Sequence, residues 1–130
     1  MQVDDDNNCF VCGCDNHHGV HARFTIDADN NSAKCVYTIA AHYQGWHNIA
    51  HGGILATLLD ETCVYACRPL AEKVVTAALS LRYKKPVPVN TELQVSATVV
   101  EIKKRYFMVR ANITIDNNVY TEAEAKVFIC

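Results

Sequence analysis

One segment of the chain has the apolar periodicity of a long helix, and every other periodic segment alternates as strands do. The helical pattern covers residues 53–68, and Pro69 stops it. At about 100° per residue, one arc carries Ile54, Leu55, Leu58, Leu59, Thr62, Tyr65 and Ala66. The opposite face carries Ala56, Thr57, Asp60, Val64 and Cys67. That second face is too apolar for a solvent-facing surface, so we expect one face to pack on a sheet and the other to meet a second subunit.

Two strand-like segments precede the predicted helix and four follow it. They cover residues 21–27, 33–41, 74–83, 93–102, 107–115 and 121–129, and the fourth shifts phase near Val100, as a β-bulge would. The Asx-rich residues 27–32 and the sequence DNNV at 116–119 predict turns. Short connections favour an α+β fold in which one antiparallel sheet of about six strands wraps around a central helix. We expect a single domain over residues 1–130, with residues 1–8 flexible.

The composition narrows the classes of function. Hydrophobic residues make up 50% of the 130 residues, and the net charge of −2 argues against a general nucleic-acid binder. No apolar stretch approaches the ~20 residues of a transmembrane helix. Residues 1–8 are acidic and polar, unlike a secretory signal. We therefore expect a cytoplasmic protein that binds neither nucleic acid nor membrane.

Seven cysteines without a secretory signal argue against a disulfide framework. Four in apolar segments are predicted to be small buried hydrophobes: Cys35, Cys63, Cys67 and Cys130. Cys9, Cys12 and Cys14 precede His17, and three thiolates with a histidine could close one tetrahedral zinc site. The spacing is compressed, however, and the second half of a zinc knuckle is missing. The preferred interpretation is a loop packed on the sheet without metal, with catalytic thiol chemistry at Cys12 as a further alternative.

The sequence HGG at residues 51–53 opens the predicted helix, and Asp60 follows about two turns later. A helix N-terminus exposes unpaired N–H groups, and glycine lets a ligand approach them closely. Such donors stabilise an oxyanion by ~2.7–4 kcal/mol each in well-studied enzymes. Asp60 lies roughly 10 Å along the axis from Gly53, so the two meet only if two helices run antiparallel across a dimer interface. That arrangement suits ester or thioester hydrolysis; the alternative is a tight turn at Gly52 and Gly53 with Asp60 exposed.

Three stretches carry a family resemblance: CFVCGCDNHHGVHARF, GWHNIAHGGILATLLDETCVYA and VVTAALSLRYKKPVPVNTELQVSATVV. HGG-x6-D followed by T-x-x-L-x-x-x-Y-x-x-P resembles the hotdog-fold acyl-CoA thioesterases of the phenylacetate-degradation and 4-hydroxybenzoyl-CoA type. The first stretch resembles a subgroup with an N-terminal Cys-Phe-x-Cys-Gly motif. The resemblance covers the chain from Cys9 onward. It implies a hotdog fold and homodimers, often paired into homotetramers, with active sites across the dimer interface.

The resemblance also implies roles for single residues. Asp60 matches the catalytic acid, as nucleophile or as general base on water, and Glu61 is the rival base about 100° further round the helix. Gly52 matches the backbone donor to the thioester oxygen. His51 matches the histidine that shapes the turn and assists the leaving thiol. Thr76 falls where some relatives hold a Ser or Thr that orients water. The implied catalytic set is therefore Asp60, Gly52, His51, Gly53 and Thr76.

One position departs from the family pattern. Many relatives place Asn or Gln six residues before the motif histidine, where this chain has Gly45. Gln44 and Asn48 are the candidates to replace that amide beside the reacting carbonyl. Trp46, just before the motif, either lines the acyl pocket or serves as a core or interface aromatic.

Basic residues are the candidates for binding the phosphates of coenzyme A, because ammonium and guanidinium groups suit phosphate recognition. They are Arg82, Lys84, Lys85, Lys103, Lys104 and Arg105. The alternative for this group is a charged turn that protects strand edges from pairing.

The leading prediction is a thioester hydrolase that converts a small, medium or aromatic acyl-CoA to the free acid and coenzyme A. No cofactor is required for this reaction, with coenzyme A entering as part of the substrate and structural zinc as the alternative noted above. The alternatives are a non-catalytic acyl-CoA-binding hotdog protein, a hydratase or dehydratase on the same fold, and a metal-binding module. A carrier-protein thioester stands as an alternative to acyl-CoA.

Overall fold

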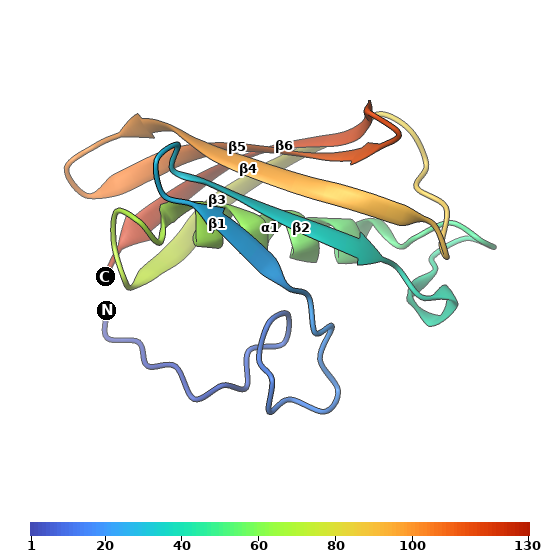
Figure 1. Ribbon diagram of the computed structural model, residues 1–130, viewed down its shortest axis with the longest axis horizontal. Coiled ribbons are helices and arrows are strands. Elements are labelled where there is room, and N and C mark those ends of the chain that lie inside the picture. The colour runs from blue at the N-terminus through green and yellow to red at the C-terminus, as the bar shows by residue number, and fades with distance from the viewer.

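Six β-strands and one α-helix make up the computed structural model, which describes residues 1–130 (Figure 1). In chain order they are β1 (Phe24–Asp27), β2 (Ser32–Thr38), α1 (Gly52–Cys67), β3 (Val74–Tyr83), β4 (Glu92–Ile102), β5 (Tyr106–Ile115) and β6 (Asn118–Ile129). The predicted order of two strands, one long helix and four strands is confirmed. No helix of the molecule combines the length and the apolar character that crossing a membrane requires.

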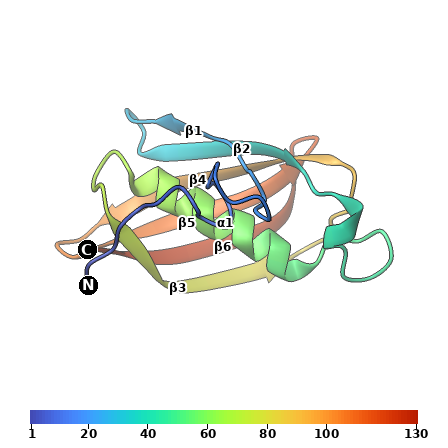
Figure 2. The ribbon, with the colours of Figure 1, turned by 90° about the horizontal axis from the view of Figure 1, so that it is seen from below.

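All six strands form one antiparallel sheet in the order β1-β2-β4-β5-β6-β3. β3 follows the helix in sequence but lies at the edge of the sheet, where it pairs only with β6. Figure 2 shows α1 lying across one face of the sheet, with β3 along one border. One side of the β3 backbone therefore has no partner strand, as at any sheet edge.

The buried face of α1 packs on the sheet and contacts all six strands. Its buried residues are Leu55, Leu58, Leu59, Thr62, Cys63, Ala66 and Cys67. Val95, Val109 and Val127, one each from β4, β5 and β6, meet them in the same core and are fully buried. Cys67 was expected on the opposite face of the helix, and it is fully buried as well.

The N-terminal segment, residues 7–22, lies on the side of α1 away from the sheet (Figures 1 and 2). It has no strand or helix of its own, yet Val11 and Val20 are buried in the core. The Tyr37 hydroxyl donates to the Val20 carbonyl at 2.9 Å, which joins this segment to β2. The second helix face was expected to meet another subunit. Part of that face is instead covered by the protein's own chain.

The element boundaries differ from the predicted ones mainly before the helix. The first strand begins at Phe24 rather than at residue 21, because His21 has a positive φ of 55° that interrupts extended backbone. The second strand ends at Thr38, and Ala41–Tyr43 form a 3-10 turn. The bulge predicted near Val100 is confirmed by the register shift between Val99 and Glu101.

Two further predictions concern the last strands. Asp116 and Asn117 have φ of 50° and 66°, which confirms the predicted turn between β5 and β6. Of the four cysteines predicted to be buried, Cys35, Cys63 and Cys67 are buried and Cys130 is exposed. Cys130 follows the last residue of β6, so no neighbouring element covers it.

Candidate active site

The first turn of α1 is shaped by the side chain of His51. His51 has extended backbone geometry as the N-cap, and its Nδ1 accepts a hydrogen bond from the Gly53 N–H at 2.9 Å. This bond satisfies one of the donors that a helix start leaves unpaired. The Gly52 N–H, by contrast, has no acceptor within the chain. It is therefore the free donor at the positive end of the helix dipole.

Gly52 is in close contact with Tyr83. The Tyr83 hydroxyl donates to the Gly52 carbonyl at 2.9 Å. A Cβ at Gly52 would lie 3.3 Å from the Tyr83 ring, and a Cβ at Gly53 would lie 3.1 Å from His51 Nδ1. Neither glycine has a positive φ. The HGG sequence thus serves close approach to the backbone and not an unusual backbone conformation.

A cavity of about 390 Å³ opens at this helix start. It is lined by Gly45, Trp46, Ala50, His51 and Gly52. The Trp46 side chain is 83% exposed, so it is not part of the hydrophobic core of the chain. Its ring is an exposed apolar surface beside the cavity. The free Gly52 N–H and an apolar wall therefore lie at one hollow, as a site for a carbonyl compound requires.

Asp60 lies on the side of α1 that faces the β3 edge. Its Oδ1 accepts a hydrogen bond from the Thr76 hydroxyl at 2.6 Å, and both residues are half-buried. Thr76 stands next to the bulge between Thr76 and Ala78 in the β3–β6 pair. The carboxylate and the Thr hydroxyl, which were predicted with separate roles, are thus in direct contact within one chain. Gly52 lies about 12 Å away along the helix axis, so one chain does not bring the donor to the carboxylate.

Glu61 points toward the N-terminal segment and away from Thr76. Its Oε1 accepts from the thiols of Cys12 at 3.3 Å and Cys9 at 3.7 Å. Burial is the largest cause that raises the pKa of Glu61 above its ordinary value. Burial also raises the pKa of Cys12 to about 12, and the Glu61 charge adds to this. The rival base therefore belongs to a separate cluster, which leaves Asp60 as the carboxylate facing the free sheet edge.

The predicted metal ligands Cys14 and His17 lie outside this cluster. Both are exposed, and the Cys14 thiol contacts its neighbour Asp15 at 3.8 Å. Only Cys9 and Cys12 of the predicted set come together, and Glu61 supplies the third donor atom. The predicted ligand set was wrong in this respect. Glu61 was missed because it is 49 residues away from Cys12 in the sequence.

The amides proposed to replace the missing Asn or Gln are already engaged in the loop before the helix. Gln44 Oε1 accepts from the Asn48 backbone N–H at 3.1 Å. The Asn48 side-chain amide lies 3.2 Å from His47 Nε2. A Cβ at Gly45 would lie 3.3 Å from His51 Cα, which leaves little room for a side chain there. The structure thus places no side-chain amide from these positions beside Gly52.

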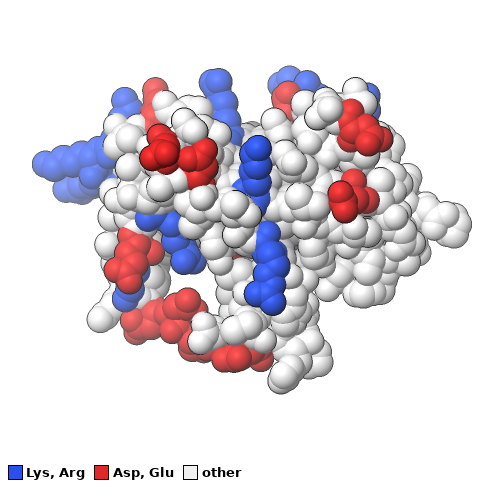
Figure 3. All heavy atoms as spheres, viewed as in Figure 1, with Lys and Arg blue, Asp and Glu red and all other residues white.

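The predicted basic group is divided between two ends of the molecule. Arg82 and Lys84 lie at the end of the sheet where Tyr83 pairs with Thr121, and Lys84 binds Glu122 at 2.9 Å. The turn Lys103–Arg105 lies at the other end, where the Arg105 carbonyl accepts from Ile129. Figure 3 shows basic side chains projecting from the end of the molecule that holds the β4–β5 turn. A single chain therefore does not bring these basic residues together, because β3 carries its end away from that turn.

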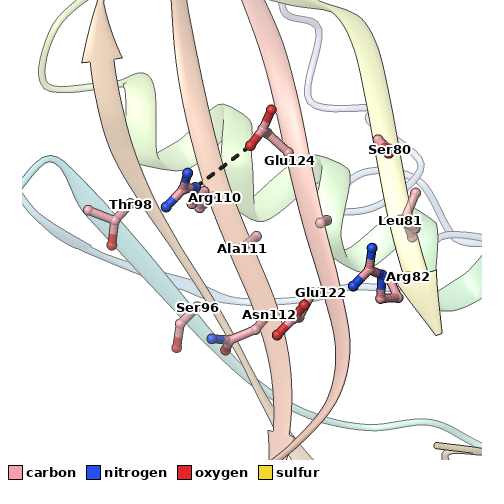
Figure 4. A pocket seen from close by; sticks show the side chains of 11 residues that line it. Ser80, Leu81, Arg82, Ser96, Thr98, Arg110, Ala111, Asn112, Glu122 and Glu124 are labelled. Atoms are coloured by element: carbon pink, nitrogen blue, oxygen red, sulfur yellow. Dashed lines mark ion pairs between the residues drawn. The ribbon is translucent and has the colours of Figure 1, made fainter. Parts of the chain in front are cut away.

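A larger hollow of about 640 Å³ lies on the outer face of the sheet, away from α1 (Figure 4). Its lining is mostly polar, and Arg110 Nε pairs with Glu124 Oε2 at 3.6 Å within it. Arg82 also lies here. The sheet separates this hollow from Asp60 and the HGG turn, so the two candidate catalytic features do not belong to it.

Comparisons with known proteins identify the family of the chain. Residues 47–121 match the thioesterase superfamily. Acyl-coenzyme A thioesterase THEM4 of Rattus norvegicus is 32% identical over 93 residues, which are 70% of this chain and 40% of the rat protein. This chain spans between 33% and 42% of the length of the first four curated relatives that match it.

Solved structures show the same fold. The crystal structure of a thioesterase superfamily protein superposes with a TM-score of 0.84 at 26% identity, covering 95% of this chain and 61% of that one. A Streptococcus mutans protein bound to acetyl-CoA superposes with a TM-score of 0.74 at 18% identity, covering 78% and 82%. The predicted hotdog fold is confirmed, and the chain belongs to the thioesterase superfamily.

Proposed function

We propose that the protein is an acyl-CoA thioesterase that works as a homodimer, with each active site built from two chains. The observation that carries this proposal is the placement of two contacts along one free edge strand. Thr76 of β3 holds the Asp60 carboxylate, and Tyr83 of the same strand holds the Gly52 turn. The carboxylate and the free backbone donor are therefore both attached to β3, at opposite ends of one strand.

Antiparallel pairing of two β3 strands would bring these ends together. Thr76 and Tyr83 stand equally far from the midpoint between Leu79 and Ser80. A twofold axis at that midpoint places Thr76 of one chain opposite Tyr83 of the other, with strands about 4.8 Å apart. Asp60 of one chain then faces the Gly52 turn of its partner. This pairing also satisfies the exposed edge of β3.

The chemistry follows from this arrangement. The thioester carbonyl oxygen accepts from the Gly52 N–H, which stabilises the negative charge that develops there during attack. Asp60 either attacks the carbonyl carbon itself, which gives an acyl anhydride that water then hydrolyses to the free acid and Asp60, or takes a proton from the attacking water. The carbon–sulfur bond breaks, and the coenzyme A thiolate leaves and takes up a proton. Thr76 holds one carboxylate oxygen and leaves the other free to act.

The relatives support coenzyme A as the carrier of the acyl group. THEM4 is named an acyl-coenzyme A thioesterase, and the Streptococcus mutans protein binds acetyl-CoA. The antiparallel dimer would also bring the Lys103–Arg105 turn of one chain to the end of the sheet that carries Arg82 and Lys84 of the other. The basic residues that are divided in one chain would then share one end of the dimer and could bind the phosphates.

Thiol release from a panel of acyl-CoA esters tests the proposal, with light scattering on the same samples. We expect turnover by the wild type, loss of about 100-fold or more in Asp60→Asn, and a mass twice the 14.5 kDa of one chain in both proteins. A dimer that turns over no ester, or an Asp60→Asn variant that retains full kcat, would contradict it.

One observation favours a second candidate, an acyl-CoA-binding protein without turnover. Gly45 occupies the position of the family amide, and a Cβ there would lie 3.3 Å from His51 Cα. The side-chain oxygen of the neighbouring Gln44 is already bound by the Asn48 backbone N–H. In that case acyl-CoA would bind saturably with no thiol release, and Asp60→Asn would change only the affinity.

A further inference from the structure

A second cluster of reactive side chains lies outside the proposed catalytic machinery. Cys9 Sγ, Cys12 Sγ and a Glu61 carboxylate oxygen all lie within 4.8 Å of one another, and all three residues are half-buried. Two of them come from the N-terminal segment and one from the middle of α1. The N-terminal segment crosses the helix at this place (Figure 2). The proposed thioesterase chemistry uses none of these groups.

The distances in this cluster match the edges of a tetrahedral zinc site. Zinc binds thiolate sulfur at about 2.3 Å and carboxylate oxygen at about 2.0–2.2 Å, so a tetrahedral angle separates sulfur from oxygen by about 3.6 Å. The two Sγ–Oε1 distances are 3.7 Å for Cys9 and 3.3 Å for Cys12. The two sulfur–oxygen edges therefore lie within a few tenths of an ångström of those that an ion at the centre requires.

The backbone of the Cys9–Gly13 loop is folded to present both sulfurs to the helix. The Val11 N–H donates to Cys9 Sγ at 3.4 Å, the kind of second contact that orients and stabilises a thiolate ligand. The Gly13 N–H donates to the Cys9 carbonyl at 2.9 Å. A Cβ at Gly13 would lie 2.4 Å from the Cys9 nitrogen, so only glycine fits this turn. The loop is thus built around the two cysteines.

We propose that Cys9, Cys12 and Glu61 bind one Zn²⁺ ion, with solvent in the fourth coordination position. Both thiols release their protons to solvent when the ion binds, and two thiolates with one carboxylate suit a soft divalent cation. The ion fastens the N-terminal segment to α1 at the residue next to Asp60. This inference concerns a separate site, and it does not depend on the proposed hydrolysis.

Metal titration of the full chain, reduced and freed of metal by a chelator, tests the site directly. Co²⁺ is the probe, because thiolate-to-cobalt charge-transfer bands report sulfur ligands and visible bands report tetrahedral geometry. We expect one Co²⁺ per chain with both bands, displaced by one equivalent of Zn²⁺. Absence of the charge-transfer band in reduced protein, or a Cys9–Cys12 disulfide in freshly purified protein with no metal bound, would overturn the proposal.

Variants identify the ligands. Cys9→Ser and Cys12→Ser should each weaken binding about tenfold or more and reduce the charge-transfer band. Glu61→Gln should weaken binding to a similar degree and keep that band. Cys14→Ser is the matched control, since Cys14 lies in the same loop but outside the cluster. Unchanged affinity in Glu61→Gln, or a loss in Cys14→Ser equal to that in Cys9→Ser, would overturn the assigned ligand set.

A measurement on the wild-type protein tests the site without any substitution that could impair folding. Zn²⁺ should slow alkylation of Cys9 and Cys12 and leave that of Cys14 unchanged, as followed by peptide mass spectrometry. Equal rates with and without Zn²⁺ would overturn the site without any substitution.

Discussion

The hydroxyl of Thr76 donates to Oδ1 of Asp60 at 2.6 Å, and this bond joins the edge strand β3 to the middle of the helix. A threonine hydroxyl has one proton to donate, so it fixes one carboxylate oxygen and leaves the other free. A hydrogen bond to a charged acceptor is stronger than one between neutral groups. Thr76 therefore acts as a positioning residue that sets the direction of the Asp60 carboxylate toward the sheet edge.

Thr76→Val should lower kcat with little change in KM. The substitution keeps the shape of the side chain but removes the hydroxyl, and hydrogen bonds to charged groups contribute about 1.5–3 kcal/mol, or roughly tenfold to a hundredfold in rate. Thr76→Ser keeps the donor and should retain most of the activity. Steady-state thiol release with an acyl-CoA ester distinguishes the two. A Thr76→Val enzyme with wild-type kcat would show that the bond does not position Asp60.

His51→Ala should destabilise the protein by about 1 kcal/mol, within a range of about 0.5–2 kcal/mol for the loss of an N-cap. The Nδ1 atom accepts the Gly53 N–H at 2.9 Å, and alanine leaves that donor without a partner. His51→Asn supplies an acceptor suited to the N-cap position and should recover most of the difference. Urea denaturation of the three proteins measures it. Equal midpoints for His51→Ala and the wild type would mean that solvent replaces the histidine fully.

Local periodicity was sufficient to predict the order of the elements. The regular alternation in residues 107–115 predicted β5, and the phase shift at Val100 predicted the bulge in β4. The paired Asx residues Asp116 and Asn117 adopt the positive φ that their turn requires. These features depend on neighbours in sequence, so a single sequence contains the information for them.

The contacts between distant segments were not predictable in the same way. The sequence indicated that Asp60 and Thr76 matter, but their contact depends on the crossover that places β3 at the edge beside β6. The meeting of Cys12 with Glu61 depends on how the N-terminal segment crosses the helix. No periodicity encodes either arrangement, because each results from the packing of the whole chain.

The seven cysteines should differ sharply in their reactivity toward iodoacetamide at mildly alkaline pH. The thiolate is the reactive form, and burial raises the pKa of Cys67 to about 12 and raises that of Cys35 and Cys63. We expect rapid alkylation of the exposed Cys14 and Cys130, and modification of the three buried cysteines only after unfolding. Peptide mass spectrometry over time gives the rates. Early modification of Cys63 in the native protein would contradict the packing of α1 on the sheet.

Thr121→Val should raise the free energy of unfolding by about 1 kcal/mol. Thr121 is fully buried on β6, and no protein group hydrogen-bonds to its hydroxyl, so without a bound water it bears the desolvation cost of a buried polar group. Valine has nearly the same shape and removes that cost. Thr62→Val is the matched control, because Thr62 is equally buried but its hydroxyl donates to the Leu58 carbonyl at 2.6 Å. Removing a satisfied hydroxyl gives no such gain, so the control should be no more stable than the wild type.

Denaturant unfolding of Thr121→Val and Thr62→Val measures whether either substitution raises the free energy of unfolding. A gain in Thr121→Val alone confirms that the hydroxyl is unsatisfied in the folded protein. A loss in Thr121→Val would show instead that the hydroxyl binds an ordered water molecule, since replacing a satisfied group would cost stability.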